Sequence, residues 1–203
     1  MLGRALHFQK RYEEAVAALE QALEIRERVY GKVHPIVADT VNELGSVAYM
    51  RDQLDEAERQ FQRMANIYRV IYNGHYFGMA VAEANLGSVC LDRKQWPRAE
   101  QYFRQALQLY IETQGPDHMN VGIANIKLGR ALLREHHYRE AEEHTFAGYQ
   151  ILSRQASPSV TWLQSARKDL AEIYEALREP EKAKKFLAER AAVESAAANA
   201  NKK

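Results

Sequence analysis

The sequence predicts an all-α protein, a solenoid of about five antiparallel helical hairpins. Two sets of residues recur along the 203-residue chain at intervals of 42 residues. Alanine occupies the first set and leucine the second: Ala15, Ala57, Ala99, Ala141 and Ala183, and Leu2, Leu44, Leu86, Leu128 and Leu170. A fixed period of this length marks a unit that cannot bury its own apolar face and must stack on its neighbours. We therefore expect an extended recognition surface.

Each unit has the pattern of two helices. In the first helix a small residue follows the leucine, and a mostly apolar residue comes three positions later. The small positions are Gly3, Gly45, Gly87, Gly129 and Ala171, and the later ones are Leu6, Ala48, Cys90, Leu132 and Tyr174. In the second helix the residue four positions after the alanine lies on the same face; it is Leu19, Phe61, Phe103, Thr145 or Leu187. Small residues let the two helices approach closely.

The units are expected at about residues 1–33, 34–75, 76–117, 118–159 and 160–194. Short polar breaks separate the two helices of a unit, at Lys10-Arg11-Tyr12, Asp52-Gln53-Leu54, Lys94-Gln95-Trp96 and His136-His137-Tyr138. Pro97 and Pro180 then fall near the first turn of a second helix, where the missing N–H of proline costs nothing.

The two ends of the chain differ from the middle. Leu2 and Gly3 correspond to Leu44 and Gly45, so the first unit lacks the leading turns of its first helix. A bare stacking surface exposes the core, and we expect self-association through this truncated unit or an N-terminal neighbour in a longer array. A short but sufficient first helix is the alternative. At the other end, residues 195–203 have no apolar periodicity, and we expect a disordered tail.

The spacing Leu44-Gly45-x-x-Ala48, followed by Ala57-x-x-x-Phe61, resembles the tetratricopeptide repeat, whose usual period is about 34 residues. The 42-residue period resembles the repeats of kinesin light chains and related bacterial proteins, in which an Ile-Arg-Glu-Lys-like run precedes Gly and His-Pro. Here that run extends from Ile25 to His34-Pro35, and Gly115-Pro116-Asp117-His118 repeats part of it. The resemblance covers residues 1–194. It implies a right-handed solenoid whose first helices line a concave groove.

Composition narrows the classes of function. The formal net charge is +1, with 46% hydrophobic and 27% charged residues, which is not basic enough for a nucleic-acid-binding surface. No apolar run approaches the length of a membrane span. The single cysteine, Cys90, cannot form an internal disulfide and occupies a core position. We expect a cytoplasmic protein that binds neither nucleic acid nor membrane.

Motifs for catalysis are missing from the sequence, which has no Gly-rich phosphate loop, nucleophile elbow, His-Glu-x-x-His or paired cysteines. His34 and His118 occupy equivalent turns between repeats and are expected to be structural. His136, His137 and His144 lie along a turn and a helix, and we do not expect them to converge on one ion. The prediction is that the chain is not an enzyme and has no cofactor or metal site.

The resemblance places the ligand-facing residues of a first helix at three slots, which lie one residue before the conserved leucine, two after it and six after it. This spacing puts them on one stripe of the helix, and in unit four all three are basic. In kinesin-light-chain-like repeats an Asn pair before the leucine holds the backbone of an extended peptide, because an amide both donates and accepts. Units two and three each keep one member of that pair. The predicted peptide-binding residues are Asn42, Asn85, Ser88, Lys127, Arg130 and Arg134.

These features predict a protein–protein interaction scaffold. Its ligand would be an extended segment or helix of a partner protein, with carboxylates that meet the basic stripe in the groove. Two alternatives stay open. The chain could instead be the regulatory C-terminal repeat module of a larger signalling protein, such as a bacterial Ser/Thr kinase. Alternatively, the basic side chains are a solvated face that bridges to Asp92, Asp169 or Glu172 of adjacent units, at 0 to about 1 kcal/mol per exposed pair.

Overall fold

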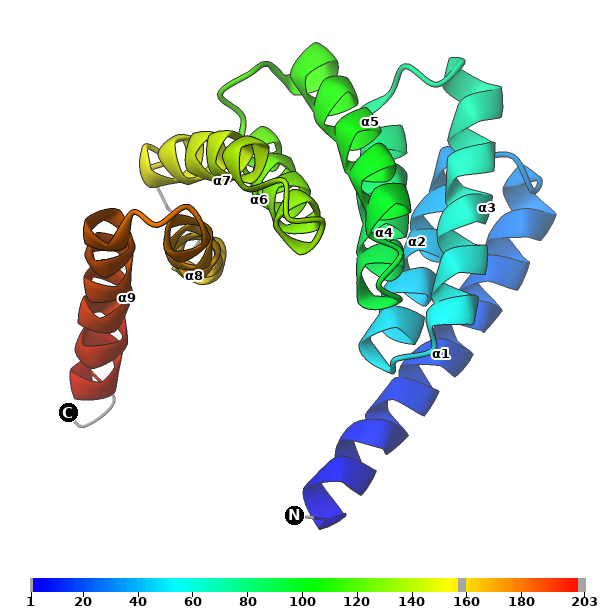
Figure 1. The fold of residues 1–203 in the computed structure, drawn as a ribbon. Coiled ribbons are helices and arrows are strands. Elements are labelled where there is room, and N and C mark those ends of the chain that lie inside the picture. The colour runs from blue at the N-terminus through cyan, green and yellow to red at the C-terminus, as the bar shows by residue number, and fades with distance from the viewer. Residues whose placement is uncertain (1, 157–159, 201–203) are drawn as a thin grey trace. The chain divides into compact units, whose positions relative to one another are not determined.

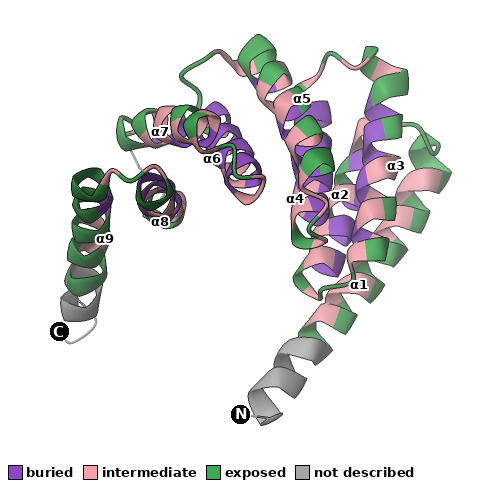
Figure 2. Cartoon of the chain, in the orientation of Figure 1, coloured by how far each residue is buried: buried purple, intermediate pink, exposed green. Residues whose placement is uncertain are grey.

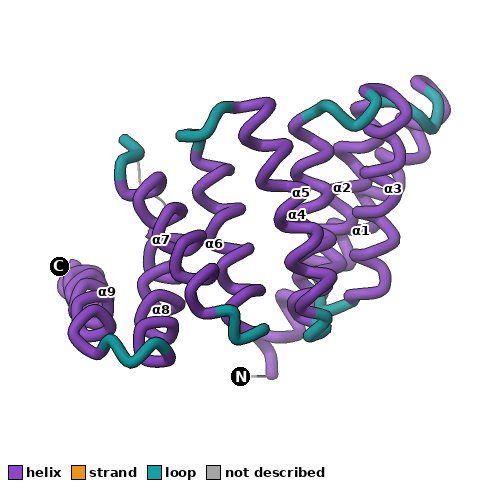
Figure 3. Tube along the Cα trace, turned by 45° about the horizontal axis from the view of Figure 1, so that its top comes forward, coloured by secondary structure: helices purple, strands orange, loops and turns teal. Residues whose placement is uncertain are grey.

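The structure is a computed structural model that describes residues 2–156 and 160–200, and the side chains of residues 11–156 and 160–195. Every regular element within these residues is an α-helix (Figures 1 and 3), which confirms the predicted all-α class. The helices are α1 (Leu2–Tyr30), α2 (Pro35–Met50), α3 (Leu54–Tyr72), α4 (Phe77–Asp92), α5 (Trp96–Gln114), α6 (Met119–Arg134), α7 (Tyr138–Ser153), α8 (Val160–Ala176) and α9 (Pro180–Ala200).

The chain forms two compact units, residues 1–93 and 94–203, and each is described by itself. In the first unit α1, α2, α3 and α4 pack in chain order, and in the second α5 to α9 do the same, with α6 also contacting α8. The buried residues of each unit lie where neighbouring helices face one another (Figure 2). Each of α2, α6 and α8 therefore packs both on its own second helix and on the second helix of the preceding repeat, as repeat stacking requires.

In repeats two to five, the turn between the two helices contains one left-handed residue at the same slot. Asp52, Lys94, His136 and Arg178 have φ values of 59°, 59°, 62° and 60° and lie 42 residues apart. One left-handed residue reverses the chain here, as it does at many helix ends. Three of the four breaks predicted from the sequence are confirmed.

The turns that lead into α2 and α6 each carry a histidine as N-cap. Nδ1 of His34 accepts a hydrogen bond from the backbone N–H of Ile36 at 3.2 Å. Nδ1 of His118 accepts one from Asn120 at 3.1 Å. Each imidazole satisfies a backbone donor that a helix start leaves without an intrahelical partner. The structural role predicted for these two histidines is confirmed.

Glycines bring paired helices into backbone contact. A Cβ added at Gly148 of α7 would lie 2.5 Å from the carbonyl oxygen of Gly122 and 3.0 Å from the backbone nitrogen of Ile126, both on α6. A Cβ added at Gly45 of α2 would lie 2.7 Å from the ring of Phe61 on α3. The contact predicted between the small residue of a first helix and the large residue of its second helix is therefore present in α2 and α3.

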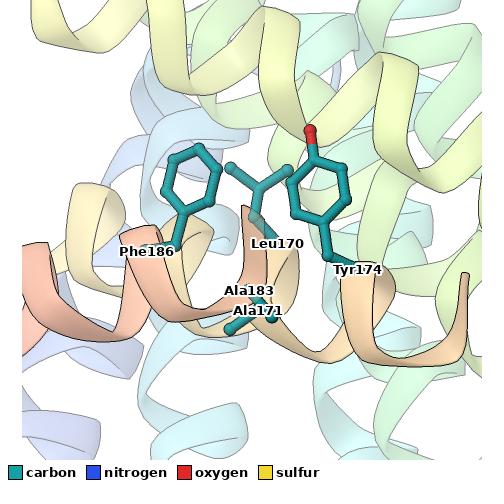
Figure 4. Close-up of a cluster of buried hydrophobic side chains, with 5 residues drawn as sticks. All are labelled: Leu170, Ala171, Tyr174, Ala183 and Phe186. Atoms are coloured by element: carbon teal, nitrogen blue, oxygen red, sulfur yellow. The ribbon is translucent and has the colours of Figure 1, made fainter. Parts of the chain in front are cut away.

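The last two helices share a separate apolar core, shown in Figure 4. Its buried residues are Leu170, Ala171 and Tyr174 of α8 and Ala183 and Phe186 of α9. The sequence pattern assigns the large residue of this second helix to Leu187, but Leu187 is exposed and Phe186 is buried. The Phe186 ring stacks on Tyr174 of α8, with centroids 5.8 Å apart, so Phe186 rather than Leu187 faces the neighbouring helix.

The first repeat departs from the prediction. The sequence predicts a break at Lys10-Arg11-Tyr12, yet α1 continues from Leu2 to Tyr30 without interruption (Figure 1). Residues 8–14 contain no Gly, Pro or Asn, and a left-handed residue at Lys10 would cost about 1–2 kcal/mol. In later repeats a first helix of 16 or 17 residues packs on its second helix and offsets that cost. Residues 2–9 form about half such a helix, and the two helices of the first repeat are continuous.

The C-terminal helix also extends further than predicted. The sequence predicts a disordered tail from residue 195, whereas α9 continues to Ala200. This segment is rich in alanine, which has the highest helix propensity and needs no apolar stripe to remain helical. Residues 201–203 lie outside the described part of the chain.

Candidate functional site

From residue 121 to its end, helix α6 leaves a single stripe of side chains accessible. Between residues 121 and 134, only Ile123, Lys127, Arg130 and Arg134 are not fully buried. Their spacing of four, three and four residues follows one line along an α-helix. The three cations predicted from the repeat slots therefore share one accessible strip, with an apolar residue at its start.

Helix α4 has the same stripe one period earlier. Between residues 78 and 90, only Val81, Asn85 and Ser88 are not fully buried. These positions are equivalent to the first three positions of the α6 stripe. The first helices of both units thus present side chains to solvent at the slots that the sequence predicts.

Within the first unit, two of the predicted residues lie together. Nδ2 of Asn85 on α4 donates to Oδ1 of Asn42 on α2 at 3.0 Å. Ser88 instead uses its hydroxyl within α4, donating to the carbonyl oxygen of Ala84 at 2.9 Å. The Tyr49 hydroxyl of α2 donates to the Asp92 carboxylate of α4. Polar side chains therefore link the stripes of α2 and α4.

In the second unit, Arg130 forms an ion pair with Asp169 of α8. Its Nε and Nη2 donate to Oδ2 of Asp169 at 2.9 and 2.7 Å, and Nη2 also donates to the Ser165 hydroxyl. Asp169 is only 2% exposed. Burial raises the pKa of this carboxyl, and the positive charge of Arg130 acts in the opposite direction. Arg130 thus stabilises the packing of α6 on α8.

The other two cations of α6 have more accessible contacts. Nη1 of Arg134 lies 2.6 Å from Oε1 of Glu172, and the two side chains are 39% and 41% exposed. The Lys127 ammonium lies 5.8 Å from the centroid of the Phe103 ring and 5.7 Å from that of Trp162, within the range of cation–π attraction. The structure thus contains two of the bridges named in the alternative reading of the sequence, Arg130 to Asp169 and Arg134 to Glu172.

A pocket of about 380 Å³ lies beside Arg134. Trp96, Leu133 and Tyr138 contribute apolar lining, and Arg134 and Glu172 contribute charge. From the sequence, Trp96 and Tyr138 are expected only at the turns between helices. One feature of the sequence could have indicated this pocket. In two consecutive repeats an aromatic residue, Trp96 or Tyr138, stands two positions after the left-handed turn residue.

A second cluster combines two carboxylates and an imidazole. One ligand atom each of Glu100, Glu135 and His137 lie within 4.8 Å of one another. Burial raises the pKa of Glu135, and the nearby Glu100 carboxylate raises it further. Nε of Arg104 donates to Oε1 of Glu100 at 2.7 Å and supplies a positive charge. This cluster is not predicted from the sequence, because Glu100 belongs to a different repeat from Glu135 and His137.

No helix among the described residues combines the length and apolar character needed to cross a membrane.

Known proteins with the same kind of repeat resemble this chain in sequence and in structure. A sequence model of the tetratricopeptide repeat matches residues 1–69 and 78–144. No curated protein matches the chain.

Several solved structures have a similar fold. BtubC (BKLC) from P. vanneervenii has a TM-score of 0.83 and 16% identity over 94% of this chain and 76% of that chain. A Podosopora anserina putative kinesin light chain with nearly identical TPR-like repeats has a TM-score of 0.75 and 19% identity over 98% and 93%. The apo form of RapI has a TM-score of 0.81 and 14% identity over 97% and 69%. The solved structures show that the repeats share the fold of kinesin-light-chain-like repeats. The match to the family model shows that the chain belongs to the tetratricopeptide repeat family.

Proposed function

We propose that this chain is a protein–protein interaction scaffold that binds an extended segment of a partner along the accessible stripes of its first helices. The observation that carries the proposal is the single, mainly polar stripe left accessible on residues 78–90 of α4 and again on residues 121–134 of α6. A helix buried on every other side can offer side chains to a ligand only along such a stripe. Stacked repeats commonly use surfaces of this kind for extended ligands.

The charges of the second unit favour a partner segment that carries carboxylates. An exposed ion pair such as Arg134 with Glu172 contributes only 0 to about 1 kcal/mol, so little is lost when a partner carboxylate replaces Glu172. The guanidinium then forms a charge-assisted hydrogen bond to the partner. The adjoining pocket supplies apolar surface for a neighbouring side chain.

The remaining predicted residues take different roles in this proposal. Asn42 and Asn85 carry amides that can bond to both donors and acceptors of a peptide backbone. Ser88 lies on the same stripe of α4. Lys127 adds positive charge beside the rings of Phe103 on α5 and Trp162 on α8. Arg130 mainly positions α8 through the buried Asp169.

A peptide array tests the proposal. The probes are extended peptides rich in Asp and Glu, with matched peptides in which Asn and Gln replace the acids. We expect selective binding of the acidic set that weakens with salt, because exposed charges are screened over about 8 Å at physiological ionic strength. The double variant Lys127→Ser/Arg134→Ser should bind at least about tenfold more weakly, since charge-assisted hydrogen bonds are lost.

A matched control removes two positive charges elsewhere. Lys184→Ser/Lys185→Ser changes exposed residues of the second helix α9 and should leave peptide binding unchanged. Equal losses in both double variants would indicate a general charge effect and contradict a site on α6. Absence of any acidic binder would contradict the proposed partner chemistry.

A further inference from the structure

Two carboxylates of the second unit lie together at a place where the preceding repeat has an ion pair. In the first unit, Arg93 at the end of α4 donates to the Glu58 carboxylate of α3. The equivalents of these residues, 42 positions later, are Glu135 at the end of α6 and Glu100 of α5. The cation of the pair is therefore replaced by a second anion. Two like charges this close repel each other unless a cation or a proton lies between them.

The imidazole of His137 completes a group of three metal-ligating side chains. One ligand atom each of Glu100, Glu135 and His137 lie within 4.8 Å of one another. The backbone that carries two of them is held by the turn between α6 and α7. His136 is left-handed in this turn, and the backbone N–H of His137 donates to the carbonyl oxygen of Leu132 at 2.9 Å. Glu135 and His137 therefore extend from a fixed backbone beside α5.

The negative charge of this group is only partly compensated. Nε of Arg104 donates to Oε1 of Glu100 at 2.7 Å, and Nη2 of the same side chain donates to Glu140. One guanidinium is thus shared by two carboxylates. Oε1 of Glu135 is buried and has no hydrogen-bond partner among the described residues. A buried carboxylate oxygen without a partner costs free energy, and a bound cation would remove that cost.

We propose that Glu100, Glu135 and His137 bind a divalent transition-metal ion such as Zn²⁺. The imidazole selects against Mg²⁺ and Ca²⁺, which prefer oxygen ligands. Zn²⁺ is often bound by three protein side chains and a water. The expectation from the sequence was that no metal site exists, because only the histidines were considered and Glu100 belongs to another repeat.

The geometry requires a small closure of the three side chains around the ion. Ligand atoms on a tetrahedral Zn²⁺ lie about 3.4 Å apart, at metal–ligand distances of about 2.1 Å. The three groups therefore approach one another by at most about 1.4 Å from their present 4.8 Å. His137 is exposed and free to adjust. The bound ion would join α5 to the turn between α6 and α7, and this role does not depend on the proposed peptide binding.

Restoring the cation of the preceding repeat tests the site while preserving the fold. Glu135→Arg recreates the pair that Arg93 makes with Glu58. Zn²⁺ binding to the whole chain is measured by calorimetric titration in metal-free buffer at neutral pH. We expect saturable binding by the parent and at least about tenfold weaker binding by Glu135→Arg, with unchanged helical circular dichroism. A parent that does not bind Zn²⁺, or a variant that binds it equally well, would overturn the proposal.

The two neighbouring histidines provide a matched comparison. His137→Asn should weaken Zn²⁺ binding at least about tenfold, and asparagine suits the N-cap position that His137 occupies before α7. His136→Asn should bind Zn²⁺ as the parent does, because asparagine tolerates the left-handed conformation of His136. Equal losses in the two variants would indicate unspecific binding to adjacent histidines and contradict the site.

Thermal unfolding gives an independent readout. A ligand that binds only the folded chain raises the melting temperature, so Zn²⁺ should stabilise the parent and His136→Asn but not Glu135→Arg. The same concentration of Mg²⁺ should have no such effect, since the site includes a nitrogen ligand. Equal stabilisation by Mg²⁺ would contradict the role of His137. If Glu100 and Glu135 only share a proton, Zn²⁺ leaves the melting temperature of the parent unchanged, and the proposal is wrong.

Discussion

Replacing Arg130 with methionine is expected to destabilise the protein by about 3 kcal/mol, because removing one member of a buried ion pair leaves its partner charge uncompensated. The partner is Asp169, which is 2% exposed and accepts from two guanidinium nitrogens. Urea unfolding followed by circular dichroism at neutral pH measures the effect. Arg134→Met is the matched control, since its pair with Glu172 is exposed and should contribute less than about 1 kcal/mol.

The loss in the Arg130 variant should depend on pH with a defined sign. Burial raises the pKa of Asp169 above its ordinary value, and Arg130 opposes the rise. Without Arg130 the folded-state pKa rises further, so the folded protein holds the Asp169 proton more tightly than the unfolded chain does. Stability is then lost as pH increases from the unfolded pKa of about 3.9 through the folded pKa. The difference from the parent should be largest at pH 7 and shrink toward pH 4.

A second substitution checks the cause. Arg130→Met/Asp169→Leu removes both charges and should recover most of the lost stability, because well-packed apolar residues often replace a buried ion pair without loss. If Arg130→Met were as stable as Arg134→Met, the pair with Asp169 would be no more than a surface contact. Failure of the double variant to recover stability would point to lost packing of the arginine stem.

The sequence predicts the parts of this structure that depend on local spacing. The period of 42 residues locates the helices, the left-handed turn at Asp52 and the close contact of Gly45 with Phe61. It also locates the slots of Lys127 and Asn85, since the face of a helix follows from residue spacing alone. Because these features recur in several repeats, the pattern in one repeat strengthens the same prediction in the others.

Features that depend on contacts between repeats could not be predicted in the same way. Spacing puts Arg130 on an accessible stripe, but it does not show that the side chain bonds to Asp169 of the next first helix. The free energies of a continuous helix and of a left-handed turn at Lys10 differ by only about 1–2 kcal/mol. Whether the turn forms therefore depends on how well the preceding segment packs on the second helix. The cluster of Glu100, Glu135 and His137 joins two repeats, and only the structure brings its members together.

The close approach of α6 and α7 leads to the other large expected effect. Gly148→Ala should destabilise the protein by about 3 kcal/mol, the upper part of the range for overpacking a well-packed contact. The added Cβ would meet the carbonyl oxygen of Gly122 at 2.5 Å and the backbone nitrogen of Ile126 at 3.0 Å. Backbone atoms of a helix cannot move aside singly, so the two helices must separate along their length. Thermal and urea unfolding of the variant and parent measure the loss.

Gly45→Ala is the control that isolates the backbone contact. Its new Cβ would meet the Phe61 ring at 2.7 Å, and a side chain can shift where a backbone cannot. Both substitutions gain the same helix propensity, up to about 1 kcal/mol for alanine over glycine, so this gain cancels in the comparison. We therefore expect Gly148→Ala to be clearly less stable than Gly45→Ala. Equal stability of the two variants would mean that α6 and α7 are further apart than the structure places them, and that Gly148 is not required for their close packing.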